Sequence, residues 1–377
     1  MKLPHIFAAI SLVVALGLGA GAAVGLRWLA GDQSTAPVGL RSLSEAAGPL
    51  VVYSEFGETA DTLWAANPDD PSDRTQLAVV QHALGFAISP SLSLGGVYVA
   101  YTVMPPSGPQ AAELWVLDIE SAEARSLAVG VDLLSTPVWS AQADAVIVRR
   151  SDGGEDEAGN ARLLRIDLSG TTAVLVSAAA GLYPINFSPD GAWLYYAELS
   201  ASGTDLVRVR AQGGALETLS HLSDGIARDW SLSPDGTRLT YLAQADGAGF
   251  GARVLDLSTG RAVTPLREAV AAQFNPIWAP DGDLTVGQLS GGGSALRLSG
   301  EGGSLTPAAQ LPRPEAGDGF DVPLSWSPDG VRLAVRAFEG TSTADPGPSW
   351  VVVVSADGER HQLSPLSDVT IAGWLGP

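Results

Sequence analysis

The sequence predicts an all-β fold, a single β-propeller of seven blades, from three observations. A Pro-Asp-Gly corner recurs along the chain at a spacing that suits one propeller blade. Apolar and polar residues alternate after each corner, as they do in a β-strand with one buried face. A hydrophobic residue precedes each corner at a constant position, and this marker allows the repeats to be counted.

The corners have the composition of a tight turn between two strands. Proline fixes φ, the aspartate side chain bonds to nearby backbone, and glycine accepts a positive φ. The four clear copies are Phe187-Ser-Pro-Asp-Gly191, Leu232-Ser-Pro-Asp-Gly236, Trp278-Ala-Pro-Asp-Gly282 and Trp326-Ser-Pro-Asp-Gly330. Their aspartates lie 45, 46 and 48 residues apart, and each repeat has room for two hairpins. Four strands per repeat at this period are typical of a propeller blade.

Degenerate copies extend the series in both directions. The seven predicted markers are Ile88, Trp139, Phe187, Leu232, Trp278, Trp326 and Trp374. The last marker leaves room for only one strand, whereas residues 50–80 contain three strand-like segments and no marker. We therefore expect the C-terminal strand to pair with the N-terminal ones, which closes the ring and removes exposed sheet edges. Six blades are the alternative if one degenerate copy is a loop.

The N-terminus has the pattern of an export or membrane segment. Residues Ile6 to Leu26 are 21 consecutive uncharged positions, and a bilayer span needs about 20. A small-residue run from Gly19 to Ala23 also suits signal cleavage. We expect residues 1–29 to be a signal anchor or a signal peptide, 30–47 a linker and 48–377 the propeller. The propeller is then expected outside the cytoplasm, anchored to the cytoplasmic membrane, or secreted or periplasmic if the leader is cleaved.

Composition excludes several classes of function. The formal net charge of −20 opposes binding to nucleic acid, so we expect no nucleic-acid partner. The chain has no cysteine, and its only lysine is Lys2, so the propeller has no thiol nucleophile and no Schiff-base lysine. The three histidines after the leader, His82, His221 and His361, are predicted near the outer strands of different blades. We accordingly predict no catalytic residue.

The corners with a preceding aromatic residue, each followed by an alternating strand, resemble the repeats of TolB-like, WD-repeat-like β-propellers. Similar repeats occur in the propellers of prolyl oligopeptidase relatives. The resemblance covers residues 86–377 and implies a fold whose members are commonly periplasmic or surface proteins that bind other proteins. TolB carries an α/β domain before its propeller, and oligopeptidases carry a hydrolase domain with a Gly-x-Ser-x-Gly elbow. This sequence shows neither, so neither the Tol–Pal role nor peptidase activity carries over.

One candidate ligand contact is the pair Arg228 and Asp229. The pair lies shortly before the marker Leu232, where the innermost strand of the blade begins and side chains can face the axial channel. A mutual ion pair is the alternative interpretation. The corner aspartates are interpreted as turn residues and the aromatic markers as core residues between blades.

A candidate calcium site lies in the loop Ser151–Asn160. It carries four carboxylates within a short stretch, and carboxylate oxygens are preferred calcium ligands. These are Asp152, Glu155, Asp156 and Glu157. The spacing differs from that of the standard calcium loop, so a solvated acidic hairpin tip is the alternative. No other cofactor is expected.

Together these observations predict a non-catalytic binding or scaffolding module for a protein or a cell-envelope ligand. The alternative is a propeller enzyme, a metal-assisted hydrolase or lyase that uses carboxylates in the axial channel. A convergent cluster of acidic or histidine side chains at the channel mouth distinguishes the enzyme from the binding module. A sensory ectodomain is a third hypothesis.

Overall fold

The computed structural model describes residues 48–108, 111–152, 160–244, 249–266, 272–289, 295–300, 305–310 and 319–376. The chain divides into two compact units, Met1–Val38 and Gly39–Pro377, and all described residues lie in the second. The predicted leader at 1–29 and linker at 30–47 fall outside the described residues. Within the described ranges there is no helix with the length and hydropathy of a membrane span.

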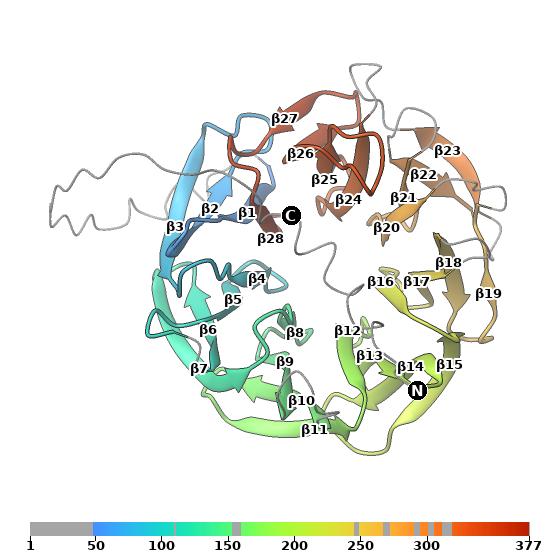
Figure 1. Ribbon diagram of the computed structural model, residues 1–377, viewed down its shortest axis with the longest axis horizontal. Coiled ribbons are helices and arrows are strands. Elements are labelled where there is room, and N and C mark those ends of the chain that lie inside the picture. Colours follow the sequence, from blue (N-terminus) through green and yellow to red (C-terminus); the bar gives the residue numbers. More distant parts are fainter. Residues whose placement is uncertain are drawn as a thin grey trace, which may run out of the picture. The chain divides into compact units, whose positions relative to one another are not determined.

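The described part of the chain forms seven four-stranded antiparallel sheets, which are the blades of a propeller (Figure 1). The prediction of an all-β, seven-bladed propeller is confirmed, and the six-bladed alternative is wrong. From the innermost to the outermost strand, blades 1 to 4 are β28 (Val369–Leu375), β1 (Leu50–Glu55), β2 (Ala60–Ala66), β3 (Arg74–Gln81); β4 (Ser89–Leu92), β5 (Tyr98–Val103), β6 (Ala112–Asp118), β7 (Glu123–Val131); β8 (Val138–Trp139), β9 (Ala145–Asp152), β10 (Asn160–Asp167), β11 (Thr172–Ala178); and β12 (Gly181–Phe187), β13 (Trp193–Ser200), β14 (Gly203–Arg210), β15 (Glu217–Ser223). Blades 5 to 7 are β16 (Ala227–Leu232), β17 (Arg238–Gln244), β18 (Phe250–Asp256), β19 (Ala262–Val263); β20 (Gln273–Trp278), β21 (Leu284–Gln288), β22 (Leu296–Ser299), β23 (Thr306–Gln310); and β24 (Phe320–Trp326), β25 (Arg332–Phe338), β26 (Ser349–Ser355), β27 (Arg360–Gln362).

The corners join the first and second strands of a blade as predicted. In blade 4, Ser188 Oγ donates to Asp190 Oδ1 at 2.5 Å and accepts the backbone N–H of Trp193 at 3.0 Å. Asp190 Oδ1 also accepts the backbone N–H of Ala192 at 3.0 Å, and Gly191 has a φ of 69°. The aspartate and glycine are therefore explained by the turn itself, without a ligand.

The marker of blade 2 is wrong in the sequence-based prediction. Leu92, not Ile88, occupies the position before the corner, which is formed by residues 93–96. Ser93 Oγ accepts the backbone N–H of Tyr98 at 3.0 Å, as the first residue of the corner does in blade 4. This corner contains two glycines in place of Pro-Asp-Gly, so the motif that located the other corners is missing here.

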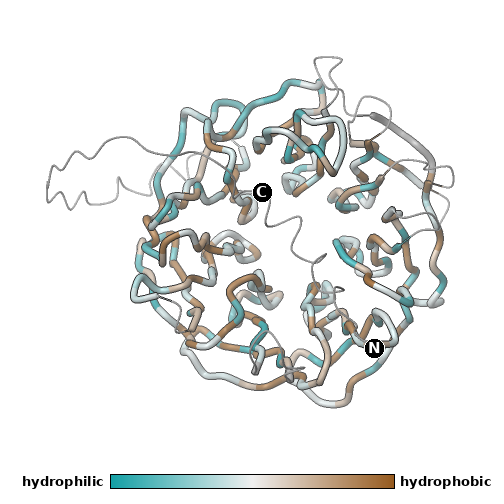
Figure 2. The backbone as a smooth tube through the Cα atoms, viewed as in Figure 1, coloured by the Kyte–Doolittle hydropathy of each residue, from teal (hydrophilic) through white to brown (hydrophobic). Residues whose placement is uncertain are grey.

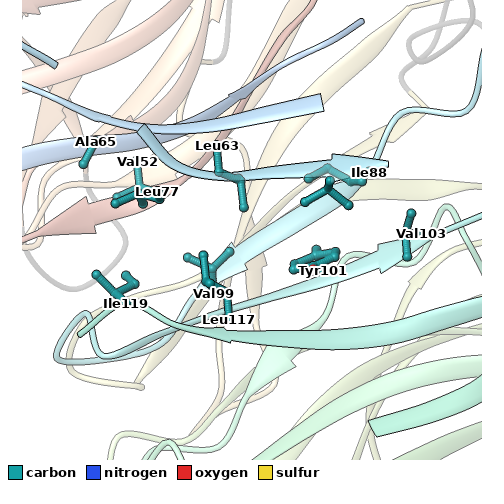
Figure 3. Close-up of a cluster of buried hydrophobic side chains, with 11 residues drawn as sticks. Val52, Leu63, Ala65, Leu77, Ile88, Val99, Tyr101, Val103, Leu117 and Ile119 are labelled. Atoms are coloured by element: carbon teal, nitrogen blue, oxygen red, sulfur yellow. The ribbon is translucent and has the colours of Figure 1, made fainter. Parts of the chain in front are cut away.

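The core lies between neighbouring blades. The apolar side chains of each strand alternate with polar ones along the chain (Figure 2). The cluster in Figure 3 joins Val52 and Leu63 of blade 1 to Val99, Tyr101 and Leu117 of blade 2. Each blade therefore buries its faces against its two neighbours.

The tryptophan markers are wedged between blades, as predicted for core residues. All four are buried. Each indole N–H donates to the preceding blade: Trp139 to Ser91 O, Trp278 to Ser231 O, Trp326 to Thr285 Oγ1 and Trp374 to Ser325 Oγ, at 3.0 to 3.1 Å. Satisfying the indole N–H is what allows such a large polar-tipped ring to be buried.

In blade 1, the first and last strands of the propeller lie side by side. β28 pairs with β1 from Leu50↔Leu375 to Glu55↔Val369. The two faces of the ring differ in their connections. The corner face carries the turns between first and second strands, such as 188–191. The opposite crossover face carries the loops between blades, such as 82–88, and the starts of the innermost strands from β4 to β28.

Candidate binding site at the channel mouth

The innermost strands share a bulge near the middle of their length. The pairing register shifts within residues 184–186 of β12, 228–231 of β16, 274–277 of β20 and 323–325 of β24. A bulge leaves a residue unpaired and re-aims its side chain. Because the irregularity recurs from blade to blade, the bulge belongs to the fold, and blades differ in what they place on it.

In β16 the bulge carries the predicted pair. Asp229 has a φ of 56°, in the left-handed region, and the equivalent Asn275 of β20 has a φ of 33°. Asn275 donates its amide to Pro323 O of the next blade at 2.5 Å. No hydrogen bond to the Asp229 carboxylate is found among the described residues. The same bulge thus holds an internally bonded amide in blade 6 and an available carboxylate in blade 5.

Arg228 and Asp229 form a loose ion pair. Arg228 Nε lies 3.9 Å from Asp229 Oδ2, and the two side chains are 33% and 32% exposed. The guanidinium of Arg228 lies over the Phe250 ring, 4.4 Å from its centroid. The ion pair anticipated as the alternative interpretation is therefore present, and it leaves part of both side chains open to contact from the channel.

Desolvation raises the pKa of Asp229 above its ordinary value, and the charge of Arg228 opposes this rise. A carboxyl group that is desolvated yet a third exposed lies in a recess surrounded by protein, rather than on an open surface. This is the position expected at the wall of a propeller channel.

Three further residues extend the site across blades 3 to 5, and sequence reasoning did not find them. The Trp230 ring lies 5.7 Å from the Tyr183 ring at an interplanar angle of 35°. The guanidinium of Arg149, from β9, lies 5.1 Å from the Tyr183 centroid on the other blade boundary. We call Arg149, Tyr183, Arg228, Asp229 and Trp230 the channel-mouth site. A signal did exist, because Tyr183 and Arg228 each lie four residues before their marker and so share one position.

The channel-mouth site combines fixed and unsatisfied groups. Arg149 is held by an ion pair with Asp132, which also accepts the backbone N–H of Ser151 at 2.9 Å. In contrast, the buried Nε of Arg228 and Nε1 of Trp230 have no hydrogen-bond partner among the described residues. Aromatic faces, two cations and one carboxylate together suit a polar ligand that also presents a ring or an apolar group.

The predicted calcium site cannot be assembled from the described residues. Asp152 ends β9, whereas Glu155, Asp156 and Glu157 fall outside the described ranges. The calcium site therefore stays a prediction. In the part of the chain that the structure describes, no three His, Asp or Glu side chains are grouped so as to hold a metal ion.

The histidines lie where the sequence places them, near outermost strands of three different blades. His82 follows β3 and is buried, with Nε2 3.0 Å from Asp61 Oδ1. His221, in β15, has Nδ1 2.7 Å from Asp205 Oδ1. Two hydrogen bonds from carboxylates raise the pKa of this exposed imidazole. His361 lies in β27.

The largest cavity, about 810 Å³, lies on the corner face between blades 5 and 6. Its carboxylates belong to the turns that line it. Asp235 accepts from Ser233 and Thr237, Asp256 accepts from Ser258 and Thr259, and Asp283 pairs with Arg297. The acidic lining is therefore explained by turn geometry, and the groove lies away from the channel-mouth site.

No protein-family model and no curated protein matches the chain. Solved structures match its fold. TolB from Acinetobacter baumannii superposes with a TM-score of 0.53 at 14% identity, over 86% of this chain and 65% of the TolB chain. The chain has the fold of the TolB propeller. A prolyl endopeptidase matches with a TM-score of 0.60 at 16% identity, over 86% of this chain and 49% of its own. An oligogalacturonate lyase in complex with manganese matches with a TM-score of 0.55 at 14% identity, over 78% and 82%.

These comparisons confirm the resemblance to TolB-like propellers at the level of the fold. The chain spans 65% of the TolB chain and about half of the endopeptidase. The same fold thus serves proteins named for binding systems, peptidases and lyases, and function must be argued from the site.

Proposed function

We propose that the chain is a non-catalytic, extracytoplasmic binding or scaffolding module that takes a protein or cell-envelope ligand at the channel-mouth site. The observation that carries the proposal is the cluster of aromatic, cationic and carboxylate side chains contributed by three adjacent blades. Such a cluster supplies stacking area together with a few oriented polar groups, which is the usual composition of a recognition site. The shared fold with TolB agrees with a binding role.

The proposal includes export and a membrane tether formed by residues 1–29, with residues 30–47 as a linker. It is supported by the uncharged run from Ile6 to Leu26. Intact mass of the natively produced protein tests the tether. We expect an unprocessed N-terminus and fractionation with membranes. A mass that fits a new N-terminus between about residues 22 and 35 would show a cleaved signal peptide instead.

The binding proposal is tested by capturing cell-envelope components on the full-length chain and comparing two double variants. Arg228→Ala with Asp229→Asn alters the channel-mouth site. Glu123→Gln with Arg125→Ala makes the same change of charge on exposed positions of the outer strand β7. We expect the first variant to lose at least about tenfold in affinity for a captured component, as loss of a central charged contact does, and the second to bind normally. Equal binding by both would place the ligand elsewhere.

A second candidate is a propeller enzyme, a metal-assisted hydrolase or lyase, and the raised pKa of Asp229 favours it. A carboxyl group with a raised pKa in a recess is a candidate general acid. The fold shared with an oligogalacturonate lyase agrees with this alternative. Turnover of uronate or peptide substrates that Asp229→Asn abolishes would replace the binding proposal, as would stoichiometric zinc, iron or manganese in elemental analysis.

A further inference from the structure

The crossover face carries large apolar side chains in three successive loops between blades. Leu366 follows blade 7 and is 44% exposed, Leu84 and Phe86 follow blade 1 and are 69% and 39% exposed, and Leu134 follows blade 2 and is 72% exposed. Single exposed apolar residues are ordinary, but a set gathered on one face marks an interaction surface. We call these four residues the crossover patch.

Backbone hydrogen bonds tie the loops of the patch to one another. Phe56 N–H donates to Asp368 O at 2.9 Å, which joins the loop of Leu366 to blade 1. Gly85 N–H donates to Glu58 O at 2.8 Å within blade 1. Ala83 N–H donates to Met104 O at 2.9 Å, so the loop of Leu84 and Phe86 is joined to blade 2.

The last loop is tied to blade 2 in the same way. Thr102 Oγ1 donates to Leu133 O at 2.7 Å, next to Leu134. Thr102 and Met104 are two residues apart at the end of β5. A continuous series of bonds therefore runs from the loop of Leu366, through blades 1 and 2, to Leu134. The four apolar side chains belong to one connected surface.

The loop that carries Leu84 and Phe86 is firmly anchored from below. The buried carboxylate of Asp61 accepts the backbone N–H of Ile88 at 2.9 Å and lies 3.0 Å from His82 Nε2. The Phe56 ring stacks on His82, with 5.9 Å between centroids. Both ends of the loop are thus fixed, so the fold holds the two apolar side chains outward in a preorganised arrangement, which lowers the cost of binding.

Two carboxylates lie within the patch and give it a charge. Glu58 lies beside the loop of Leu84, and Asp368 is two residues from Leu366; both are exposed. Neither makes an ion pair with another described residue. With a net charge of −20, the chain attracts cations and repels anionic lipid headgroups. An apolar surface with free carboxylates is complementary to a segment that has apolar residues on one face and cations at its border.

We propose that the crossover patch docks a basic amphipathic segment of a partner protein, with the apolar face of the segment on Leu84, Phe86, Leu134 and Leu366 and its cations near Glu58 and Asp368. This inference rests on the proposed binding function, and it identifies a surface and a partner chemistry separate from the channel-mouth site. The two sites open on the same crossover face, over blades 7 to 3 and blades 3 to 5 respectively.

The test uses the full-length chain and a synthetic helical probe of about 18 residues, or about five turns, with leucine on one face and lysine on the other. A matched probe carries glutamate in place of lysine. Binding is followed by fluorescence anisotropy at two salt concentrations. The patch variant replaces Leu84, Phe86, Leu134 and Leu366 by serine. The control variant replaces the exposed corner-face residues Leu94, Val97, Leu216 and Val331 by serine.

We expect the lysine probe to bind the wild type and the control variant alike, and to bind the patch variant at least about tenfold more weakly. The double variant Glu58→Gln with Asp368→Asn should weaken binding and reduce its salt dependence. Because all the altered side chains are exposed, thermal melts should remain close to wild type.

The proposal is overturned if the glutamate probe binds as well as the lysine probe, or if the control variant loses as much as the patch variant. Recruitment to anionic vesicles that depends on the patch, without peptide binding, would assign the surface to lipid and also overturn it. The channel-mouth double variant separates the two proposals. If it binds the probe normally, the patch acts by itself, whatever the channel-mouth site binds.

Discussion

Trp374→Ala tests whether pairing of the first and last strands holds the ring together. Trp374 is 9% exposed, packs with Val51 and Tyr53 of β1, and donates its indole N–H to Ser325 Oγ of blade 7 at 3.1 Å. It therefore connects β28, β1 and the preceding blade. Its loss removes apolar area, leaves a cavity and weakens the only contact of this kind at the boundary of blades 7 and 1 among the described residues.

The expected loss is large. Burying about 150–250 Å² of a tryptophan side chain at about 25 cal/mol per Å² corresponds to about 4–6 kcal/mol as an upper limit. Substitutions of this type cost about 3–5 kcal/mol, against a total stability of about 5–15 kcal/mol for a domain. Ser325→Ala leaves the indole N–H without an acceptor and should cost about 1–3 kcal/mol.

Urea unfolding followed by circular dichroism measures both losses, as a shift of the midpoint at constant slope. Trp139→Ala is the matched control, because Trp139 has the same burial and the same kind of hydrogen bond at an internal blade boundary. We expect the two substitutions to cost similar free energies, with faster amide exchange in β28 only for Trp374→Ala. A loss below about 1 kcal/mol would refute the closure argument, because a core tryptophan cannot be removed so cheaply.

Three further predictions follow from the same contacts. Deletion of residues 368–377 should prevent cooperative unfolding at a normal temperature, because β1 is left as an open edge; a melt like that of the full chain would contradict this. Asp61→Ala should cost about 3–5 kcal/mol and accelerate amide exchange in residues 82–88, because Ile88 N–H and His82 lose their buried acceptor. Turn hydrogen bonds, chiefly from Ser258, lower the pKa of Asp256 from 3.8 to about 2. Its stabilising contribution is therefore present above pH 3.8 and lost as the pH falls towards 2, so the difference in melting temperature between the wild type and Asp256→Asn should shrink over that range.

The fold could be predicted because its main signal is local. A Ser-Pro-Asp-Gly corner specifies its turn through bonds within five residues, as in Ser188–Gly191, and repeats at the period of a blade. The misplaced marker shows the limit of this signal. Gly95 and Gly96 have φ values of 81° and 70° and make a corner with no aspartate, so only the pairing of Leu92 with Val99 reveals the register.

The candidate site could be predicted only in part. Counting back from Leu232 placed Arg228 and Asp229 at the start of the innermost strand, where they lie. Tyr183 and Arg149 meet Trp230 across two blade boundaries, and such contacts depend on how blades pack. The bulge in β16 also shifts the side-chain alternation, which a simple two-residue period does not anticipate.

The wedge residues between blades have a consequence for the width of the channel. In a closed ring, the angles between neighbouring blades must add up to a full turn, so a thinner wedge at one boundary has to be offset at the others. Blades 4 and 5 carry Phe187 and Leu232 at the wedge position, where four other blades carry tryptophan. The same two blades place the large rings of Tyr183 and Trp230 nearer the crossover face. Aromatic volume is thus distributed along the strand, away from the corner and towards the channel mouth, and the opening can change shape while the number of blades stays at seven.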